Sequence, residues 1–123
     1  MNFTFTNQPN FIEVTDHGRP ETRDYHRFFD LLKSFAGWMP GRNLLIDDTH
    51  LDVSRMTGQD IRDAIFVTEL RSEVFGSSKI AIYTPNDLEF GFNRMWQSWV
   101  DEVIDADARV CRSRDRALAW LAA

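Results

Sequence analysis

The chain has 123 residues, of which 43% are apolar and 27% are charged, and its formal net charge is −5. This length and composition predict one globular domain with its own core and exclude a disordered chain. The negative charge disfavours nonspecific binding to nucleic acid or to an anionic membrane. The single cysteine, Cys111, has no partner for a disulfide within the chain, the N-terminal segment is unlike a signal peptide, and no apolar run approaches the roughly 20 residues of a membrane span. We therefore expect a cytoplasmic protein of prokaryotic type, without stable membrane insertion.

Strands and helices alternate along the chain. Alternating apolar and polar residues predict a β-hairpin of residues 2–6 and 11–15. Beyond it, apolar residues at spacings of three and four predict helices, and short apolar runs predict strands. In chain order these elements are a helix over 20–36, a strand over 43–46, a helix over 58–75, a strand over 79–84, a helix from Asn86 to about residue 104, a strand over 108–112 and a helix over 114–122. This order predicts one α/β domain, residues 1–123, with a mixed, largely parallel sheet, an antiparallel N-terminal hairpin and four helices.

Several helix boundaries have recognisable residues. Pro20 stands where a first helical residue would be, and Thr57 and Ser113 are suited to cap the helices that follow them. Asn86 with Glu89 three residues later resembles a capping box.

The segment KIAIYTPNDLEFGFNRMW resembles the strand–turn–helix signature of the SpoIIAA-like branch of the STAS superfamily. The shared features are an apolar strand, a short polar turn, the pair Phe90–Gly91 and then Arg94–Met95. The ending VCRSRDRALAWL is similar to the closing strand and helix of that family, and LLIDDT is similar to its central strand, which ends at Asp47. The resemblance covers nearly the whole chain and implies a STAS-like fold.

The resemblance also implies a function. It indicates a non-catalytic binding or regulatory module that acts through protein–protein contacts and needs no cofactor. Relatives that antagonise anti-sigma factors carry an Asp–Ser pair at the start of the helix after the central strand, and that Ser is phosphorylated. This chain has Met56–Thr57 at the corresponding place. Some relatives of related architecture hold apolar ligands, so a small-molecule or lipid-binding domain is the alternative.

Asp47 and Asp48 follow the predicted central strand. Ligands of open α/β sheets gather outside the carboxyl ends of the strands, and two adjacent carboxylates could bind a divalent cation. Alternatively, both carboxylates bond backbone amides of their loop. With Thr57 and Asn86 the two residues form a possible ligand loop, which His50 could approach. Because no third ligand or base is visible, a metal-dependent enzyme ranks third among the hypotheses, and we assign no catalytic residue and no metal ligand.

The helix predicted over 58–75 has apolar residues on two nearly opposite arcs. One arc contains Ile61, Ala64, Ile65, Thr68 and Phe75, and the other contains Phe66, Val67, Leu70 and Val74. A helix that lies on a sheet needs only one such arc, so the second is expected to bury against a helix, a ligand or a partner subunit. We therefore predict a homodimer with Phe66, Leu70 and Val74 in its contact, and a regulatory protein is a possible further partner.

The helix after Asn86 offers a second surface. Its predicted core stripe consists of Leu88, Phe92, Met95, Trp96, Trp99, Val100 and Val103. Phe90 points away from this stripe and lies near Arg94, and Gly91 leaves room for a close approach. We predict a partner site at Phe90, Gly91 and Arg94. In the alternative, a loop covers Phe90 while Arg94 pairs with a nearby acid.

Overall fold

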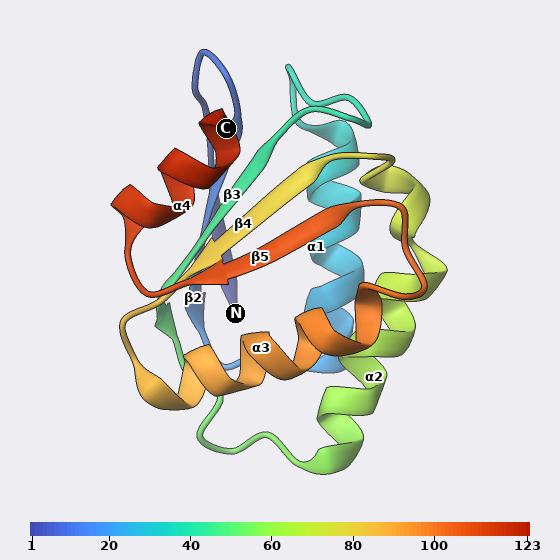
Figure 1. The fold of residues 1–123 in the computed structure, drawn as a ribbon. Coiled ribbons are helices and arrows are strands. Elements are labelled where there is room, and N and C mark those ends of the chain that lie inside the picture. The colour runs from blue at the N-terminus through green and yellow to red at the C-terminus, as the bar shows by residue number, and fades with distance from the viewer.

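The computed structural model describes residues 1–123 as a five-stranded sheet with helices on both faces (Figure 1). The elements in chain order are β1 (Asn2–Asn7), β2 (Ile12–Gly18), α1 (Thr22–Ser34), β3 (Leu44–Leu51), α2 (Gly58–Leu70), a 3-10 helix (Ser72–Val74), β4 (Lys79–Tyr83), α3 (Asp87–Val100), β5 (Asp107–Cys111) and α4 (Arg114–Ala122). The strands lie in the order β1-β2-β3-β4-β5; β1 pairs antiparallel with β2, and the other neighbours pair parallel. The predicted mixed sheet, N-terminal hairpin and four helices are thus confirmed. None of the helices has the length and apolar character needed to cross a membrane.

The alternation of side chains along the strands divides the core between the two faces of the sheet. On one face, residues of α1 and α2 pack with Ile12, Val14, Leu44, Ile46, Ile80 and Ile82. On the other face, Ala117 and Leu121 of α4 pack with Leu45, Ala81, Tyr83 and Cys111. The central strand β3 is therefore buried on both faces at its start, as its unbroken apolar run predicted. Cys111 is a buried free thiol within this second cluster.

Two predicted helix caps are present. The Thr57 hydroxyl accepts a hydrogen bond from the Asp60 amide at 3.2 Å, and the Asp60 carboxylate accepts one from the Thr57 amide at 2.8 Å. The Ser113 hydroxyl accepts a hydrogen bond from the Arg116 amide at 3.3 Å. These bonds satisfy amides that the first turn of a helix leaves without a partner.

One other predicted boundary and one predicted cap are wrong. The first helix begins at Thr22, two residues after Pro20, because Glu21 is its N-cap and forms a capping box with Asp24. α3 does begin after Asn86, but Glu89 does not complete a capping box there. Its carboxylate is buried and accepts a hydrogen bond from the Val53 amide at 3.1 Å.

α2 ends at Leu70, so the helix predicted over 58–75 is shorter and both of its apolar arcs are cut at that point. The 3-10 turn that follows directs Val74 and Phe75 into the core, and Val67 is also buried. Val74 is therefore wrong as part of a surface contact, because the chain changes direction before it. Phe66 and Leu70 remain exposed, with 64% of Phe66 accessible.

α3 is rotated about its axis relative to the predicted core stripe. Its buried residues are Glu89, Asn93 and Val100. Four apolar residues of the predicted stripe lie exposed instead: Leu88, Met95, Trp99 and Val103. The inward polar residues both have interior hydrogen-bond partners, which the apolar pattern of the helix alone does not reveal.

The contrast between Phe75 and Phe66 gives a matched stability test. Phe75 is 2% exposed within the core, so we expect Phe75→Ala to lower the free energy of unfolding by about 3–5 kcal/mol. Phe66→Ala, the same change on the solvent side of α2, should alter it by no more than about 0.5 kcal/mol. Urea denaturation of the two variants and the wild type measures both values; equal losses would contradict the burial of Phe75 and the exposure of Phe66.

Candidate functional site

A pair of buried carboxyl groups lies at the carboxyl end of two neighbouring parallel strands. Asp16 continues the inward face of β2 beyond Val14, and Asp48 continues that of β3 beyond Ile46. The pairing between these strands shifts register within residues 15–17, which locally redirects the side chains. Asp16 is 9% exposed and Asp48 is 3% exposed, and the two carboxyl groups are close enough to shift each other's pKa.

The two carboxyl groups line a cavity of about 80 Å³ that is otherwise largely apolar. Asn93 of α3 donates a hydrogen bond from Nδ2 to Asp48 Oδ2 at 2.7 Å. The Oδ1 atoms of Asp16 and Asp48 accept no hydrogen bond from any protein donor. The aromatic residues of the lining are Phe3, Tyr25, Phe28, Phe29, Phe75, Phe92 and Trp96. The chain thus builds an aromatic cavity with two acidic groups in its wall.

Burial and mutual repulsion control the charge of this pair. Burial raises the pKa of Asp16 well above its usual range, and the neighbouring Asp48 raises it further. Burial also raises the pKa of Asp48, although hydrogen bonds from Asp16 and Asn93 oppose that shift. Two carboxyl groups in contact cannot both ionise readily, so the pair holds a proton over a wider pH range than separate carboxyls would.

The cavity has a negative electrostatic field. Burial raises the pKa of the Tyr25 hydroxyl, and the carboxylates of Asp48, Asp16, Asp60 and Asp24 raise it further. No Lys, Arg or His side chain lines the cavity, and the N-terminal ammonium of Met1, another lining residue, is paired with Asp24 at 3.7 Å. A positively charged group would therefore be favoured inside it.

The predicted ligand loop is only partly assembled. Asp47 and Asp48 point to opposite faces of the sheet, because successive side chains of a strand alternate, so they do not form the predicted cation-binding pair. The Asp47 carboxylate accepts a hydrogen bond from the Thr49 amide at 2.8 Å, as in the alternative considered for it. Asn86 donates to the Thr49 carbonyl at 3.1 Å and so joins this loop, whereas Thr57 is engaged at the start of α2.

The contacts of His50 and of the other acids do not create a cation-binding site at this loop. His50 stacks on His17, with ring centroids 5.2 Å apart, rather than approaching an Asp pair. No three His, Cys, Asp or Glu side chains are grouped so that they could hold a metal ion.

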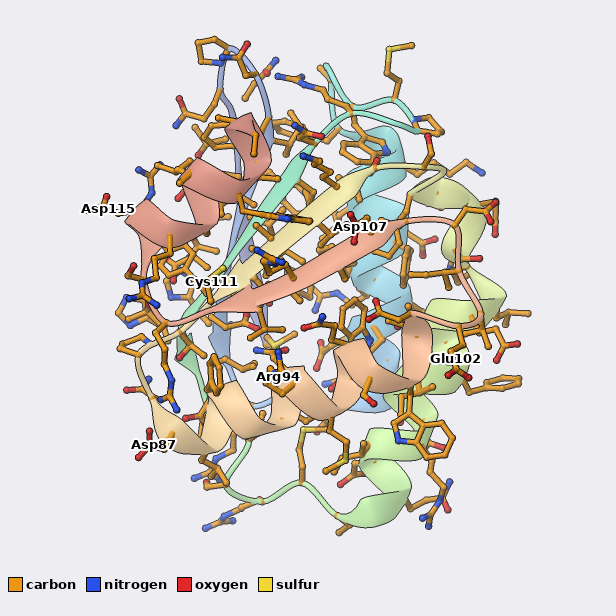
Figure 2. All side chains as sticks on the ribbon, viewed as in Figure 1. Asp87, Arg94, Glu102, Asp107, Cys111 and Asp115 are labelled. Carbon is orange, nitrogen blue, oxygen red and sulfur yellow. The ribbon has the colours of Figure 1, made fainter.

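A second site is an arginine-lined groove between α3 and α4 at the edge strand β5. We call it the Arg groove; its basic side chains are Arg94, Arg109, Arg112 and Arg116, and no Asp or Glu side chain lines it. Figure 2 shows Arg94 on the side of α3 that faces β5. Arg94, Arg109 and Arg116 form no ion pair, while Arg112 pairs with Asp87 at 2.6 Å.

The predicted partner site lies within the Arg groove. Phe90 and Arg94 both line it, but the guanidinium that lies over the Phe90 ring belongs to Arg112, at 3.8 Å from the ring centroid. Phe90 is half-buried against the core, between the two alternatives considered for it. Gly91 is exposed, and a Cβ there would meet no atom within 4 Å. The arginines of β5 and α4 were missed, although the segment RVCRSRDR places them close together in the sequence.

A search of solved structures supplies the fold family. An uncharacterized protein of the DUF3478 family with a SpoIIAA-like fold, from Shewanella loihica PV-4, matches with a TM-score of 0.62 and 19% sequence identity. The match covers 98% of this chain and 92% of that chain. No family model and no curated protein matches the sequence. The chain therefore has a SpoIIAA-like fold, which confirms the resemblance noted in its sequence.

The carboxyl pair makes stability depend on pH in a defined direction. A pKa raised on folding means that the folded state holds a proton that the unfolded state, with an Asp pKa of about 3.9, has released. The free energy of unfolding should therefore fall as pH rises from about 4 through the raised pKa of Asp16. Asp16→Asn removes one acid and offers an Nδ2–H donor to Asp48. We expect it to raise the free energy of unfolding at pH 8 by on the order of 1 kcal/mol and to flatten the decline between pH 5 and pH 8.

Urea denaturation at several pH values between 5 and 8 measures this effect. Asp52 has a pKa that hydrogen bonds from Ser54 lower to about 2, so it changes stability only at more acidic pH. Asp47→Asn, the same substitution one residue from Asp48 but on the other face, is the comparison. It removes only the weakest contribution to the raised pKa of Asp16 and should flatten the decline less than Asp16→Asn does. An unchanged slope in Asp16→Asn would contradict the shared proton.

Proposed function

We propose that this domain is a non-catalytic binding module that recognises an acidic segment of a protein partner in the Arg groove. The observation that carries the proposal is the presence of three arginines without ion pairs in one groove of a chain whose net charge is −5. A protein with an excess of acids can readily neutralise its own guanidinium groups. Three that are left free, side by side, are available to carboxylates of another molecule.

The aromatic residues of the groove strengthen the proposal. Arg112 lies over Phe90, and Arg109 lies over Trp120 with its guanidinium carbon 5.4 Å from the ring centroid. Stacking of this kind holds a guanidinium in place while its edge can still donate two hydrogen bonds to a carboxylate. Aromatic and arginine side chains together are common centres of protein–protein contacts. The SpoIIAA-like fold, whose STAS relatives often contact proteins, agrees with a binding role.

A fluorescently labelled peptide rich in Glu tests the groove. We expect the double variant Arg94→Gln/Arg109→Gln to weaken binding of the peptide at least tenfold, measured by anisotropy, because two unpaired guanidinium groups are lost. Added salt should weaken binding to the wild type, since the contacts are exposed.

The matched control removes two exposed arginines outside the groove, Arg55→Gln/Arg62→Gln. It changes the net charge equally and should bind the peptide within about twofold of the wild type, as expected when only screened, long-range attraction is altered. Equal weakening by both double variants, or tighter binding of single-stranded DNA than of the peptide, would count against a site for an acidic protein segment.

The exposed apolar stripe of α3 favours the predicted homodimer as a second contact. Leu88, Met95 and Trp99 repeat along one side of this helix, Val103 lies in the turn that follows it, and Trp99 is 63% exposed. A contact related by a two-fold axis would use this stripe on both copies and remove all eight side chains from water. This surface differs from the predicted one on α2, of which Phe66 and Leu70 stay exposed.

Sedimentation at tens of micromolar, a concentration suited to affinities near micromolar, tests the dimer. We expect the wild type to sediment as a dimer and Trp99→Glu as a monomer, because the change places unpaired charge in the contact. Met39→Glu, which alters an equally exposed apolar residue in the loop after α1, should remain dimeric. Dissociation by Leu70→Glu instead of Trp99→Glu would assign the contact to α2, and a monomeric wild type would exclude self-association.

A further inference from the structure

We propose that the cavity bounded by Asp16 and Asp48 is a binding site for a small organic cation, of the class of primary alkylammonium ions. The inference is separate from the Arg groove, because the residues that line the two sites are different. It rests on two carboxyl groups that are more than nine-tenths buried, line a cavity and leave oxygens without a protein donor.

The polar groups of the cavity select for a hydrogen-bond donor with positive charge. The interior supplies one donor to the carboxyl pair, Nδ2 of Asn93, which is already bonded to Asp48. Nearby donors are otherwise engaged. The indole of Trp96 donates to the Thr68 hydroxyl at 3.0 Å, and both Arg27, at 2.8 Å, and the N-terminal ammonium of Met1, at 3.7 Å, pair with Asp24. A proton shared within the pair satisfies one contact and leaves one negative charge. An ammonium group can donate to both carboxyl groups and neutralise that charge.

The walls favour the same class of ligand. Faces of aromatic rings attract cations, and desolvation strengthens this attraction. Asp60 adds to the attraction, because it raises the pKa of Tyr25 together with the carboxyl pair, whereas the charge of Asp24 is balanced by Arg27 and the Met1 ammonium. An anion would meet repulsion from the carboxyl pair, and a neutral molecule would leave the buried charge without a partner.

The size of the cavity limits the ligand. Its volume of about 80 Å³ is roughly half of the 150 Å³ cavity that holds benzene in another protein, so a head group with a few carbon atoms fits. Tyr25, Phe92 and Trp96 are only half-buried, so the cavity is not sealed from solvent. A longer ligand would place its head between the carboxyl groups and its tail toward these residues.

Three probes of similar shape and different charge test the proposal: n-propylammonium, n-propanol and propionate. Nuclear magnetic resonance can follow the side-chain amide of Asn93 and the indole N–H of Trp96 during each titration. We expect propylammonium to shift both signals with millimolar affinity, at least tenfold tighter than propanol, and propionate to shift neither. The indole N–H of Trp120, on the opposite face of the sheet, should not move.

The variant Asp16→Asn/Asp48→Asn removes the charge and keeps the shape of the cavity. It should reduce the affinity for propylammonium to that for propanol, while Asp47→Asn should retain the affinity of the wild type within about threefold, since that side chain lies on the other face. Equal affinity for propanol and propylammonium, binding of propionate, or undiminished binding to the double variant would overturn the proposal, as would no response to propylammonium. If the double variant does not fold, the comparison of the three probes on the wild type still decides the matter.

Discussion

The alternation of side chains along β2, β3 and β4 determines where the buried carboxyl pair lies and which side of α3 faces the core. On the face that carries the larger core cluster, a buried polar residue follows the apolar residues of each inward row: Asp16 in β2, Asp48 in β3 and Thr84 just after β4. Burying two carboxyl groups is unfavourable unless the interior supplies hydrogen bonds and a proton. α3 supplies one of these hydrogen bonds, because Asn93 faces inward and donates from its Nδ2 to Asp48 Oδ2 at 2.7 Å. The apolar stripe with Trp99 is then left on the outside, so the exposed face of α3 follows from the polar edge of the sheet.

The fold could be predicted because its signals are local. Each helix and strand has its own apolar period, and the caps at Thr57 and Ser113 depend on residues within the next turn. The end of α2 at Leu70 was missed, because Val74 and Phe75 continue a plausible helical spacing while in fact they pack in the core after a change of direction. The spacing of apolar residues indicates which side of a helix is buried, but it does not show where the chain changes direction.

The carboxyl pair could not be recognised in the same way. Its two members are 32 positions apart, and only the parallel pairing of β2 with β3 brings them together. Adjacent Asp47 and Asp48 look like a pair in the sequence, yet neighbours on a strand face opposite ways. One local signal was available: Asp16 follows Ile12 and Val14 at a period of two, which places it on the inward face. The same limit applies to the Arg groove. Its residues on α3 were predicted, but its residues on β5 and α4 join them only through the packing of separate elements.

The cavity and the Arg groove have α3 as their only shared element, and this connects their chemistry. Asn93 and Trp96 face the cavity, while Arg94 and Gln97, each one residue further along the helix, face the groove. Gln97 also accepts a hydrogen bond from the Val110 amide of β5 at 3.3 Å, so the helix is tied to the edge strand as well as to the carboxyl pair. If a ligand in the cavity changes the affinity of the groove for a partner, then the partner must change the affinity of the cavity for that ligand by the same factor. The two sites therefore share one positioning element, because the orientation of α3 sets where Asn93 and Trp96 meet the cavity and where Arg94 and Gln97 meet the groove.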